Sequence, residues 1–219
     1  MSRRSGKNIR RILITAGPTR ERIDPIRFIS NYSTGTFGYE IAKEAKRRGH
    51  AVTLVSGPTA LKAPKGIRFI RVESAMDMRS AVLREFPRSD CVIMAAAISD
   101  WRPASVATRK IKKRSQRLTL ELARNPDIIA ELGRKKGPRT LAGFALETED
   151  EMRNALRKLK AKNLDFIVAS RRGPGSPAFG GGKTKILVMD RFGLKEKIAG
   201  KTKRELAKII LDKLEAVNI

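Results

Sequence analysis

The 219-residue chain contains one cysteine, Cys91, and one histidine, His50. A single cysteine cannot form an intrachain disulfide, and these two residues are too few for a structural zinc site. Cys91 lies in the apolar run CVIMAAA, so we expect a small buried side chain, with a reactive thiol as the alternative. No apolar run approaches the roughly 20 residues that cross a bilayer, and the basic start MSRRSGKNIRR lacks the apolar core of a secretory signal. We therefore expect a cytoplasmic protein without a membrane contact.

Acidic and aromatic residues are also scarce. Asp and Glu total 22 against 48 Lys and Arg, which gives a net charge of +26, and aromatic residues make up 5% of the chain. This excess favours anionic partners, nucleic acid among them. However, the basic residues are scattered, the aromatic residues are too few for a base-stacking surface, and no nucleic-acid-binding signature is present. We expect part of the charge to serve phosphorylated ligands and do not expect nucleic acid as a functional partner.

The hydrophobic pattern predicts alternating strands and helices. Short apolar runs predict strands at 12–15, 51–56, 68–72, 91–96, 140–144, 166–169 and 185–189. Helical spacing predicts helices at 36–48, 74–86, 126–135, 149–162 and 201–214. We expect Asn125 to cap the third of these helices, and Thr202 with Glu205 to form a capping box at the last. This alternation predicts a doubly wound α/β fold with a mostly parallel sheet and helices on both faces.

The chain shows no linker, so we predict one domain over residues 1–219. Its N-terminal tail, 1–10, is basic. The segment from Ser105 to Leu122 is basic around KIKK and then alternates at Leu118, Leu120 and Leu122, which predicts a loop and then a strand in a hairpin outside the main sheet. The glycine- and proline-rich segment 171–183 predicts a flexible loop.

The first strand and helix carry the features of a phosphate site. The strand is followed by a turn at Gly17, and a second turn at Ser33-Thr34-Gly35 opens the helix, whose first backbone N–H groups and dipole favour an anion. The inserted segment 20–32 brings Arg20, Arg22, Asp24, Arg27 and Asn31 toward this place. A dinucleotide-binding oxidoreductase is the alternative, but the tight G-x-G-x-x-G turn that it would use is absent.

Seven blocks carry a resemblance to a known family. They are TAGPTRERIDPIRFISNYSTGTFGYEIA (15–42), VTLVSGPT (52–59), AAAISDWRP (95–103), KIKK (110–113), NPDII (125–129), GFALETED (143–150) and KNLDFIVAS (162–170). In this order the chain resembles the phosphopantothenoylcysteine synthetases, which form the C-terminal domain family of the DNA/pantothenate metabolism flavoproteins. The resemblance implies a Rossmann-like core with a small strand subdomain for dimerisation.

The resemblance also implies an activity. It indicates a ligase of coenzyme A biosynthesis that joins 4′-phosphopantothenate to L-cysteine through an acyl-cytidylate, converting CTP to CMP and pyrophosphate with Mg²⁺. The NPDI block and KIKK are more similar to the CTP-using branch than to the ATP-using branch, which remains the alternative. Because no flavin-dependent decarboxylase half is seen, we expect no FMN, and a separate decarboxylase is a possible partner.

Two residues are implied to be catalytic. The amide of Asn31 could donate to a developing oxyanion, although an asparagine before Ser33 could also serve an Asx turn. The resemblance places Lys110 on the nucleotide phosphates, in a lid over about 104–116. By its charge alone, Lys110 belongs to a run that could equally be solvated surface.

The remaining candidates bind the nucleotide or the substrate. The implied nucleotide-binding residues are Gly17, Ser33, Thr34, Gly35, Ala96, Asp100, Lys110, Asn125, Pro126, Asp127, Ile128, Phe144, Lys158 and Lys162. The implied substrate-binding residues are Arg27, Ala96, Ala97 and Asp100, with Arg27 reaching the site of a second subunit in a homodimer. The plain alternatives are a turn for Asp100, core packing for Phe144, and solvated side chains for Arg27, Lys158 and Lys162. No protein ligand to a metal is predicted.

Overall fold

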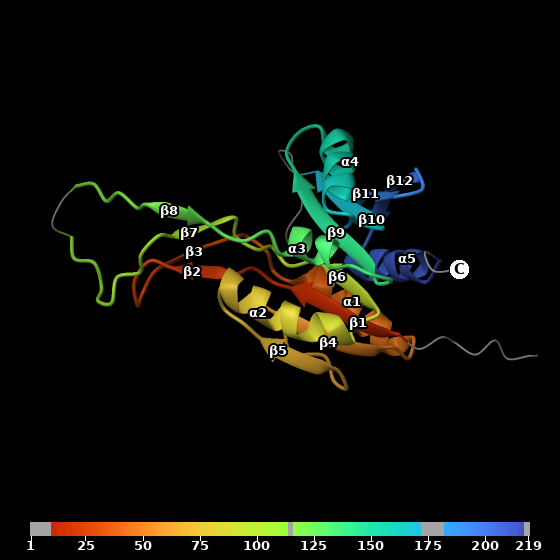
Figure 1. Ribbon diagram of the computed structural model, residues 1–219, viewed down its shortest axis with the longest axis horizontal. Helices are drawn as coiled ribbons and strands as arrows, with labels where there is room; N and C mark the ends of the chain where they lie inside the picture. The colour runs from red at the N-terminus through yellow and green to blue at the C-terminus, as the bar shows by residue number, and fades with distance from the viewer. Residues whose placement is uncertain (1–9, 114–115, 172–181, 217–219) are drawn as a thin grey trace, which may run out of the picture.

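The computed structural model describes residues 10–113, 116–171 and 182–216 (Figure 1). Eight strands of this part form one sheet. Their order is β12 (Lys195–Lys201), β11 (Thr184–Asp190), β10 (Phe166–Arg171), β9 (Thr140–Glu147), β6 (Cys91–Met94), β1 (Arg11–Ala16), β4 (Ala51–Ser56) and β5 (Arg68–Arg71). The strands from β10 to β5 pair in parallel, while β11 and β12 pair antiparallel at one edge.

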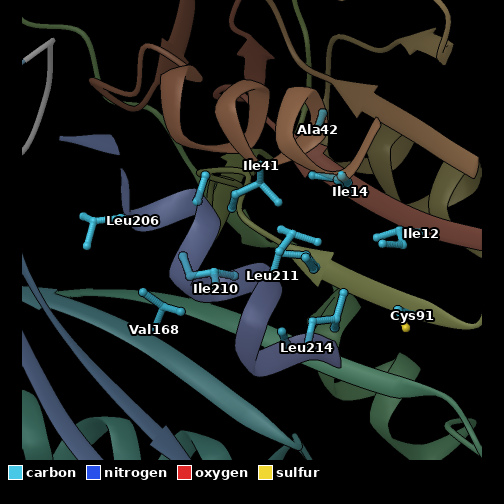
Figure 2. Packing of buried hydrophobic residues seen from close by; sticks show 14 of the residues in the cluster. Ile12, Ile14, Ile41, Ala42, Cys91, Val168, Leu206, Ile210, Leu211 and Leu214 are labelled. Atoms are coloured by element: carbon cyan, nitrogen blue, oxygen red, sulfur yellow. The ribbon is translucent and has the colours of Figure 1, made fainter. Parts of the chain in front are cut away.

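Helices cover both faces of the sheet, as predicted. α1 (Thr36–Arg47) and α5 (Lys203–Ala216) pack on one face, and Figure 2 shows Ile41 of α1, Leu211 of α5, and Ile12 and Ile14 of β1 in the buried cluster between them. α2 (Ala75–Glu85), α3 (Ile128–Arg134) and α4 (Glu151–Ala161) pack on the other face, where Leu13 points. Successive β1 side chains thus enter opposite cores, and each buried Ile or Leu contributes about 1.5–3 kcal/mol. The doubly wound α/β fold is confirmed.

Cys91 lies in β6 and is buried in the first of these cores. Burial raises the pKa of its thiol above the ordinary value. The expectation of a small buried side chain is therefore confirmed, because a thiol in these surroundings stays protonated and out of reach of solvent.

Two short hairpins form an arm outside the main sheet. β2 (Arg20–Arg22) pairs with β3 (Phe28–Ser30), and β7 (Trp101–Pro103) pairs with β8 (Leu122–Arg124). Figure 1 shows both hairpins projecting from the body of the molecule, with the loop between β7 and β8 at the far end. The predicted hairpin is confirmed. The predicted alternation, however, was placed too early, because of its leucines only Leu122 lies in a strand.

Three further details differ from the sequence analysis. β12 was not predicted, because it is an edge strand of lysines in which Ile198 alone is buried, so the apolar alternation is missing. The last helix begins at Lys203 rather than at 201. Arg10, the last residue of the predicted basic tail, is anchored to α5, because its guanidinium donates to the carbonyl oxygens of Leu214 and Glu215.

The predicted capping box can be checked against the structure, whereas most of the predicted tail and of the predicted flexible loop cannot. The capping box of Thr202 and Glu205 is confirmed: the backbone N–H of Glu205 donates to the Thr202 hydroxyl, and the backbone N–H of Thr202 donates to the Glu205 carboxylate. Residues 1–9 of the predicted tail and 172–181 of the predicted flexible loop lie outside the described residues. A one-turn 3₁₀ helix, η1 (Phe86–Arg88), follows α2 directly.

Candidate functional site

The phosphate turn is built from two glycines that touch. Gly17 and Gly35 have φ angles of +74° and +77°, a conformation that favours glycine. A Cβ atom on Gly35 would lie 3.2 Å from Cα of Gly17 and 2.7 Å from Cγ2 of Thr59. Gly35 is also the N-cap of α1, and it has no side chain to accept from the first backbone N–H groups. The predicted turn is therefore compact and presents backbone donors to an anion.

A cleft of about 150 Å³ lies at the carboxyl ends of β6 and β9. Its lining includes these predicted residues: Ala96, Asp100, Asn125, Pro126, Asp127, Ile128, Phe144 and Lys162. The chain runs from β1 outward to β4 and β5 and returns to β6 on the other side of β1. Ligands of open parallel sheets bind near such a change of direction, outside the carboxyl ends of the strands, and the cleft lies beside the one between β1 and β6.

Asn125 lines this cleft and ties its segment to residues 99–102 by hydrogen bonds. Its side-chain amide donates to the Ser99 carbonyl at 2.8 Å, and its backbone N–H donates to the Asp100 carbonyl at 2.8 Å. Its side-chain oxygen accepts from Arg102 at 3.0 Å. The predicted capping role is therefore wrong for Asn125, because its side chain holds another loop.

Asp127 is the residue that caps α3. One carboxylate oxygen accepts from the Ala130 N–H at 3.1 Å, and the other lies 3.0 Å from Nζ of Lys162. This ion pair places Lys162 in the wall of the cleft, with the charge of Asp127 beside it. Lys158, one turn earlier on α4, instead pairs with Glu147 at 2.7 Å and is not part of the cleft lining. The structure thus brings only one of the two predicted lysines to the cleft.

Phe144 lies both in the wall of the cleft and against the hydrophobic core. Its ring is half-buried, lines the cleft, and meets Phe37 of α1 edge-on with the ring centroids 5.1 Å apart. Phe144 also packs against the buried cluster beneath α1 and α5. The core-packing interpretation of Phe144 is therefore confirmed, and its role beside a nucleotide base stays a prediction, for which the ring is placed in the cleft wall.

The inserted segment returns to the end of the sheet at Asn31. The Asn31 side-chain amide donates to the Ala97 carbonyl at 3.0 Å, and the Thr19 N–H donates to the same oxygen at 3.2 Å. The Ala97 N–H in turn donates to the Gly17 carbonyl at 2.9 Å. These bonds place Asn31, Ala97 and the first glycine side by side, outside the lining of the cleft, and their roles stay predictions.

Lys110 lies in the loop of the arm and is exposed. The next residue, Ile111, is held by the β2–β3 hairpin: its N–H donates to Asp24 at 3.1 Å, and its carbonyl accepts from Arg27 at 2.7 Å. Burial alone would raise the pKa of Asp24, but the backbone donors of Ile26, Ile111 and Arg27 lower it below the ordinary value. Asp24 received no role from sequence reasoning, because nothing in the local pattern shows a partner 87 residues away.

The arm carries apolar side chains in solvent. Ile26, Phe28, Trp101, Val106, Leu118 and Leu122 are between 42% and 64% exposed. Scattered apolar residues are ordinary on a surface, but these six all belong to the two hairpins and their loop, which project from the body of the molecule (Figure 1). Such a patch is typical of a surface that another protein covers.

A larger hollow of about 610 Å³ lies beside the phosphate turn, at the ends of β4 and β5. Its lining includes Tyr39, Thr59, Arg71 and Glu73, and none of the predicted site residues. The smaller cleft, where those residues meet, is therefore the better candidate. No helix within residues 10–113, 116–171 and 182–216 combines the length and the apolar composition of a membrane span. In the same residues, no three His, Cys, Asp or Glu side chains gather as a metal site.

Residues 7–217 match the family model described as the DNA/pantothenate metabolism flavoprotein C-terminal domain. The chain belongs to this family. The membership predicted from the seven sequence blocks is therefore confirmed.

Comparison with known proteins and solved structures supports the same family. The chain is 44% identical over 208 residues to the coenzyme A biosynthesis bifunctional protein CoaBC of Bacillus subtilis. The aligned region covers 94% of this chain and 51% of that protein. It is 45% identical over 210 residues to a cysteine/cysteine sulfinic acid decarboxylase of an unknown prokaryotic organism, with 94% and 58% covered. The chain thus spans about half the length of these relatives. A crystal structure of the C-terminal domain of a CoaBC protein is 40% identical, with a TM-score of 0.81 and 94% of both chains covered.

Proposed function

We propose that the chain is a ligase that activates 4′-phosphopantothenate with CTP and joins it to L-cysteine. The observation that carries the proposal is the meeting of the 125–128 segment, Asp100, Phe144 and Lys162 in one cleft at the end of the sheet. This cleft belongs to a chain that shares 40% identity over 94% of its length with the C-terminal domain of a CoaBC protein.

In this proposal the nucleotide occupies the cleft. The base lies against the ring of Phe144 and hydrogen-bonds with the 125–128 segment, while Lys162 faces the negative charge of the ligand. The phosphates extend toward Gly17 and the start of α1 after the Ser33–Gly35 turn, where no side chain caps the first backbone N–H groups of the helix. The choice of CTP over ATP rests on the NPDI and KIKK blocks, and the same reaction with ATP is the alternative.

The residues present fit a magnesium–nucleotide complex. Mg²⁺ is held in such sites by one or two carboxylates together with phosphate oxygens. Asp100 lines the cleft, and no side-chain partner of its carboxylate is found in the described part of the chain. Asp100 would hold the ion, which would neutralise charge on the phosphates.

The chemistry has two steps. First, the carboxylate of 4′-phosphopantothenate attacks the α-phosphorus of CTP, which forms an acyl-cytidylate and releases pyrophosphate. Lys110 stabilises the charge on the phosphates in this step. The amine of cysteine then attacks the acyl carbon, loses a proton and displaces CMP. Asn31 donates to the oxyanion that forms at this carbon.

A direct assay tests the proposal. The purified chain is incubated with Mg²⁺, 4′-phosphopantothenate, L-cysteine and either CTP or ATP, and pyrophosphate, nucleoside monophosphate and the amide product are measured. We expect all three with CTP, and pyrophosphate without the amide when cysteine is left out. Release of CO₂ from cysteine without nucleotide consumption, or no pyrophosphate with either nucleotide, would contradict the proposal.

The proposal includes a homodimer. The apolar side chains of the arm need a cover, and a second copy of the same chain supplies a matching apolar surface by two-fold symmetry. Such a dimer would bring Arg27 of one arm to the substrate of the other subunit. The amide product would then pass to a decarboxylase on another domain or another chain. The cytoplasmic location and the absence of FMN remain predictions.

A further inference from the structure

Both backbone groups of one residue in the arm are held by the side chains of one turn. Oδ2 of Asp24 accepts from the Ile111 N–H at 3.1 Å, and Nη2 of Arg27 donates to the Ile111 carbonyl at 2.7 Å. The Asp24 side chain is buried, while that of Arg27 is 41% exposed. The two side chains also form an ion pair at 3.4 Å. We call Asp24 and Arg27, together with their two bonds to Ile111, the clamp.

The other oxygen of Asp24 has a separate task. Oδ1 accepts from the backbone N–H groups of Ile26 at 2.8 Å and Arg27 at 2.9 Å, which is an Asx turn that shapes the hairpin. The two oxygens of this carboxylate therefore have different partners: Oδ1 stabilises the turn of the hairpin, and Oδ2 binds the distant loop. Both roles need an acceptor oxygen. The isosteric amide of asparagine has only one acceptor oxygen, so it would be unable to fill both roles.

We infer that Asp24 is a positioning residue that sets the place of Lys110, by clamping the neighbouring Ile111 to the hairpin. The inference rests on the proposed function insofar as Lys110 serves the reacting phosphate. A lysine has four rotatable side-chain bonds, and a charge stabilises a transition state only when its backbone is already held in place. A second bond, from the Ala107 N–H to the Ile23 carbonyl at 3.0 Å, holds the loop to the same hairpin.

Asp24→Asn separates the two tasks. The amide oxygen can keep the Asx turn, but the amide nitrogen then faces two donors, the Ile111 N–H and the Arg27 guanidinium. Asp24→Ser is the second variant, because its hydroxyl can keep the turn but is too short to reach Ile111. Asp90→Asn is the matched control: Asp90 also accepts a backbone N–H, at 2.8 Å from Arg11, and pairs with that arginine away from the cleft.

The first readout is limited trypsin cleavage without any ligand, with fragments identified by mass spectrometry. Cleavage after Arg109, Lys110, Lys112 and Lys113 should be about tenfold faster in Asp24→Asn and Asp24→Ser, because hydrogen bonds to a charged group are lost. Cleavage elsewhere in the chain, and all cleavage in Asp90→Asn, should match the wild type. Unchanged cleavage of the loop in both Asp24 variants would overturn the inference. This readout holds even if the chain proves not to be a ligase.

The second readout is a double-mutant cycle on kcat. Asp24→Asn should lower kcat about tenfold in the wild type and by a smaller factor in a Lys110→Gln background, because the loss that acts through Lys110 is then absent and only the loss that acts through the Arg27 pair remains. KM for cysteine should be unchanged in both. Equal losses of kcat in the two backgrounds would overturn the role through Lys110, whereas a wild-type chain that makes no product would overturn the proposed function alone.

Discussion

Nδ2 of Asn31 lies 3.0 Å from the carbonyl oxygen of Ala97. An amide nitrogen carries two hydrogens, so this bond uses one and fixes the direction of the other. The Asn31 side chain is otherwise exposed, at the end of the sheet where the two alanines let a ligand approach the backbone. A donor held in this way needs no reorganisation when negative charge develops nearby, which is the condition for effective oxyanion stabilisation.

Asn31→Asp replaces this donor by an acceptor that would also repel the Ala97 carbonyl. We expect the first half-reaction to continue and the second to slow by roughly 100-fold or more, which is typical for the loss of one oxyanion donor. The acyl-cytidylate should therefore accumulate, and rapid-quench analysis with mass detection would reveal it.

Asn163→Asp is the matched control for this change. Nδ2 of Asn163 also donates to a backbone carbonyl, that of Gly133, at 3.0 Å, but the residue follows the end of α4 and does not bond to Ala97. Its variant should keep the wild-type ratio of the two half-reactions. Cysteine consumption at the wild-type rate in Asn31→Asp would show that the amide has another role.

Lys110→Gln removes one charge from the exposed loop. We expect turnover at saturating CTP to fall by about 100-fold, because a positioned charge at a reacting phosphate is lost. The free energy of unfolding should change by less than about 0.5 kcal/mol, because the side chain is in solvent. Lys195→Gln, on the edge strand β12, is the control of equal charge change. A normal rate in Lys110→Gln would return the KIKK run to ordinary solvated surface.

Glu44 on α1 gives a pH dependence of stability. Hydrogen bonds from Arg47 at 2.7 Å outweigh the opposing effect of burial, with help from Arg48, and lower its pKa from 4.5 to about 2. Because the folded-state pKa is depressed, the stabilisation is present above pH 4.5 and is lost as the pH falls toward 2.

Glu44→Gln tests this dependence. At pH 7 it should cost on the order of 2 kcal/mol of unfolding free energy, and at pH 3 less than about half of that should remain. Urea denaturation at the two pH values measures both numbers. Glu40→Gln, which removes a more exposed pair with Lys43 on the same helix, should cost less than about 0.5 kcal/mol at either pH. A cost for Glu44→Gln that does not vary with pH would contradict the assignment.

Local patterns were enough for most of the fold. The β1 strand, the turn at Gly17 and the start of α1 depend on neighbouring residues, and the sequence analysis placed them correctly. β12 failed because one buried residue, Ile198, leaves no apolar period. The strand at Leu122 was placed too early because alternating leucines at 118 and 120 look the same whether or not a partner strand is opposite.

The detailed roles in the site depend on longer-range contacts. Asn125 before Pro126 has the local pattern of a helix cap, yet its side chain binds Ser99, 26 residues earlier. Lys158 and Lys162 are equivalent in the helical period, and only the position of Glu147 and Asp127 decides which of them faces the cleft. Such pairings follow from how the elements pack, which the spacing of residues along one helix does not reveal.

The last prediction concerns the dimer. In this chain Asp100 lines the cleft, whereas Arg27 lies on the projecting β2–β3 hairpin (Figure 1). If Arg27 serves the neighbouring subunit and Asp100 serves its own, then Arg27→Ala and Asp100→Ala should each be nearly inactive alone. Each should still form dimers in sedimentation experiments, because neither change removes an apolar side chain of the arm.

Mixing the two variants and re-forming the dimers should restore activity. In a hybrid dimer the Arg27→Ala subunit keeps its own Asp100 and receives Arg27 from its partner, so one site of two is intact. Random pairing of equal amounts makes about half of the dimers hybrids, so recovery should approach roughly a quarter of the wild-type rate. Mixing wild type with Asp100→Ala controls for the exchange itself, which native mass spectrometry can verify. Absence of recovery after verified exchange would mean that both residues act within one chain, and that the arm binds a second copy without completing its site.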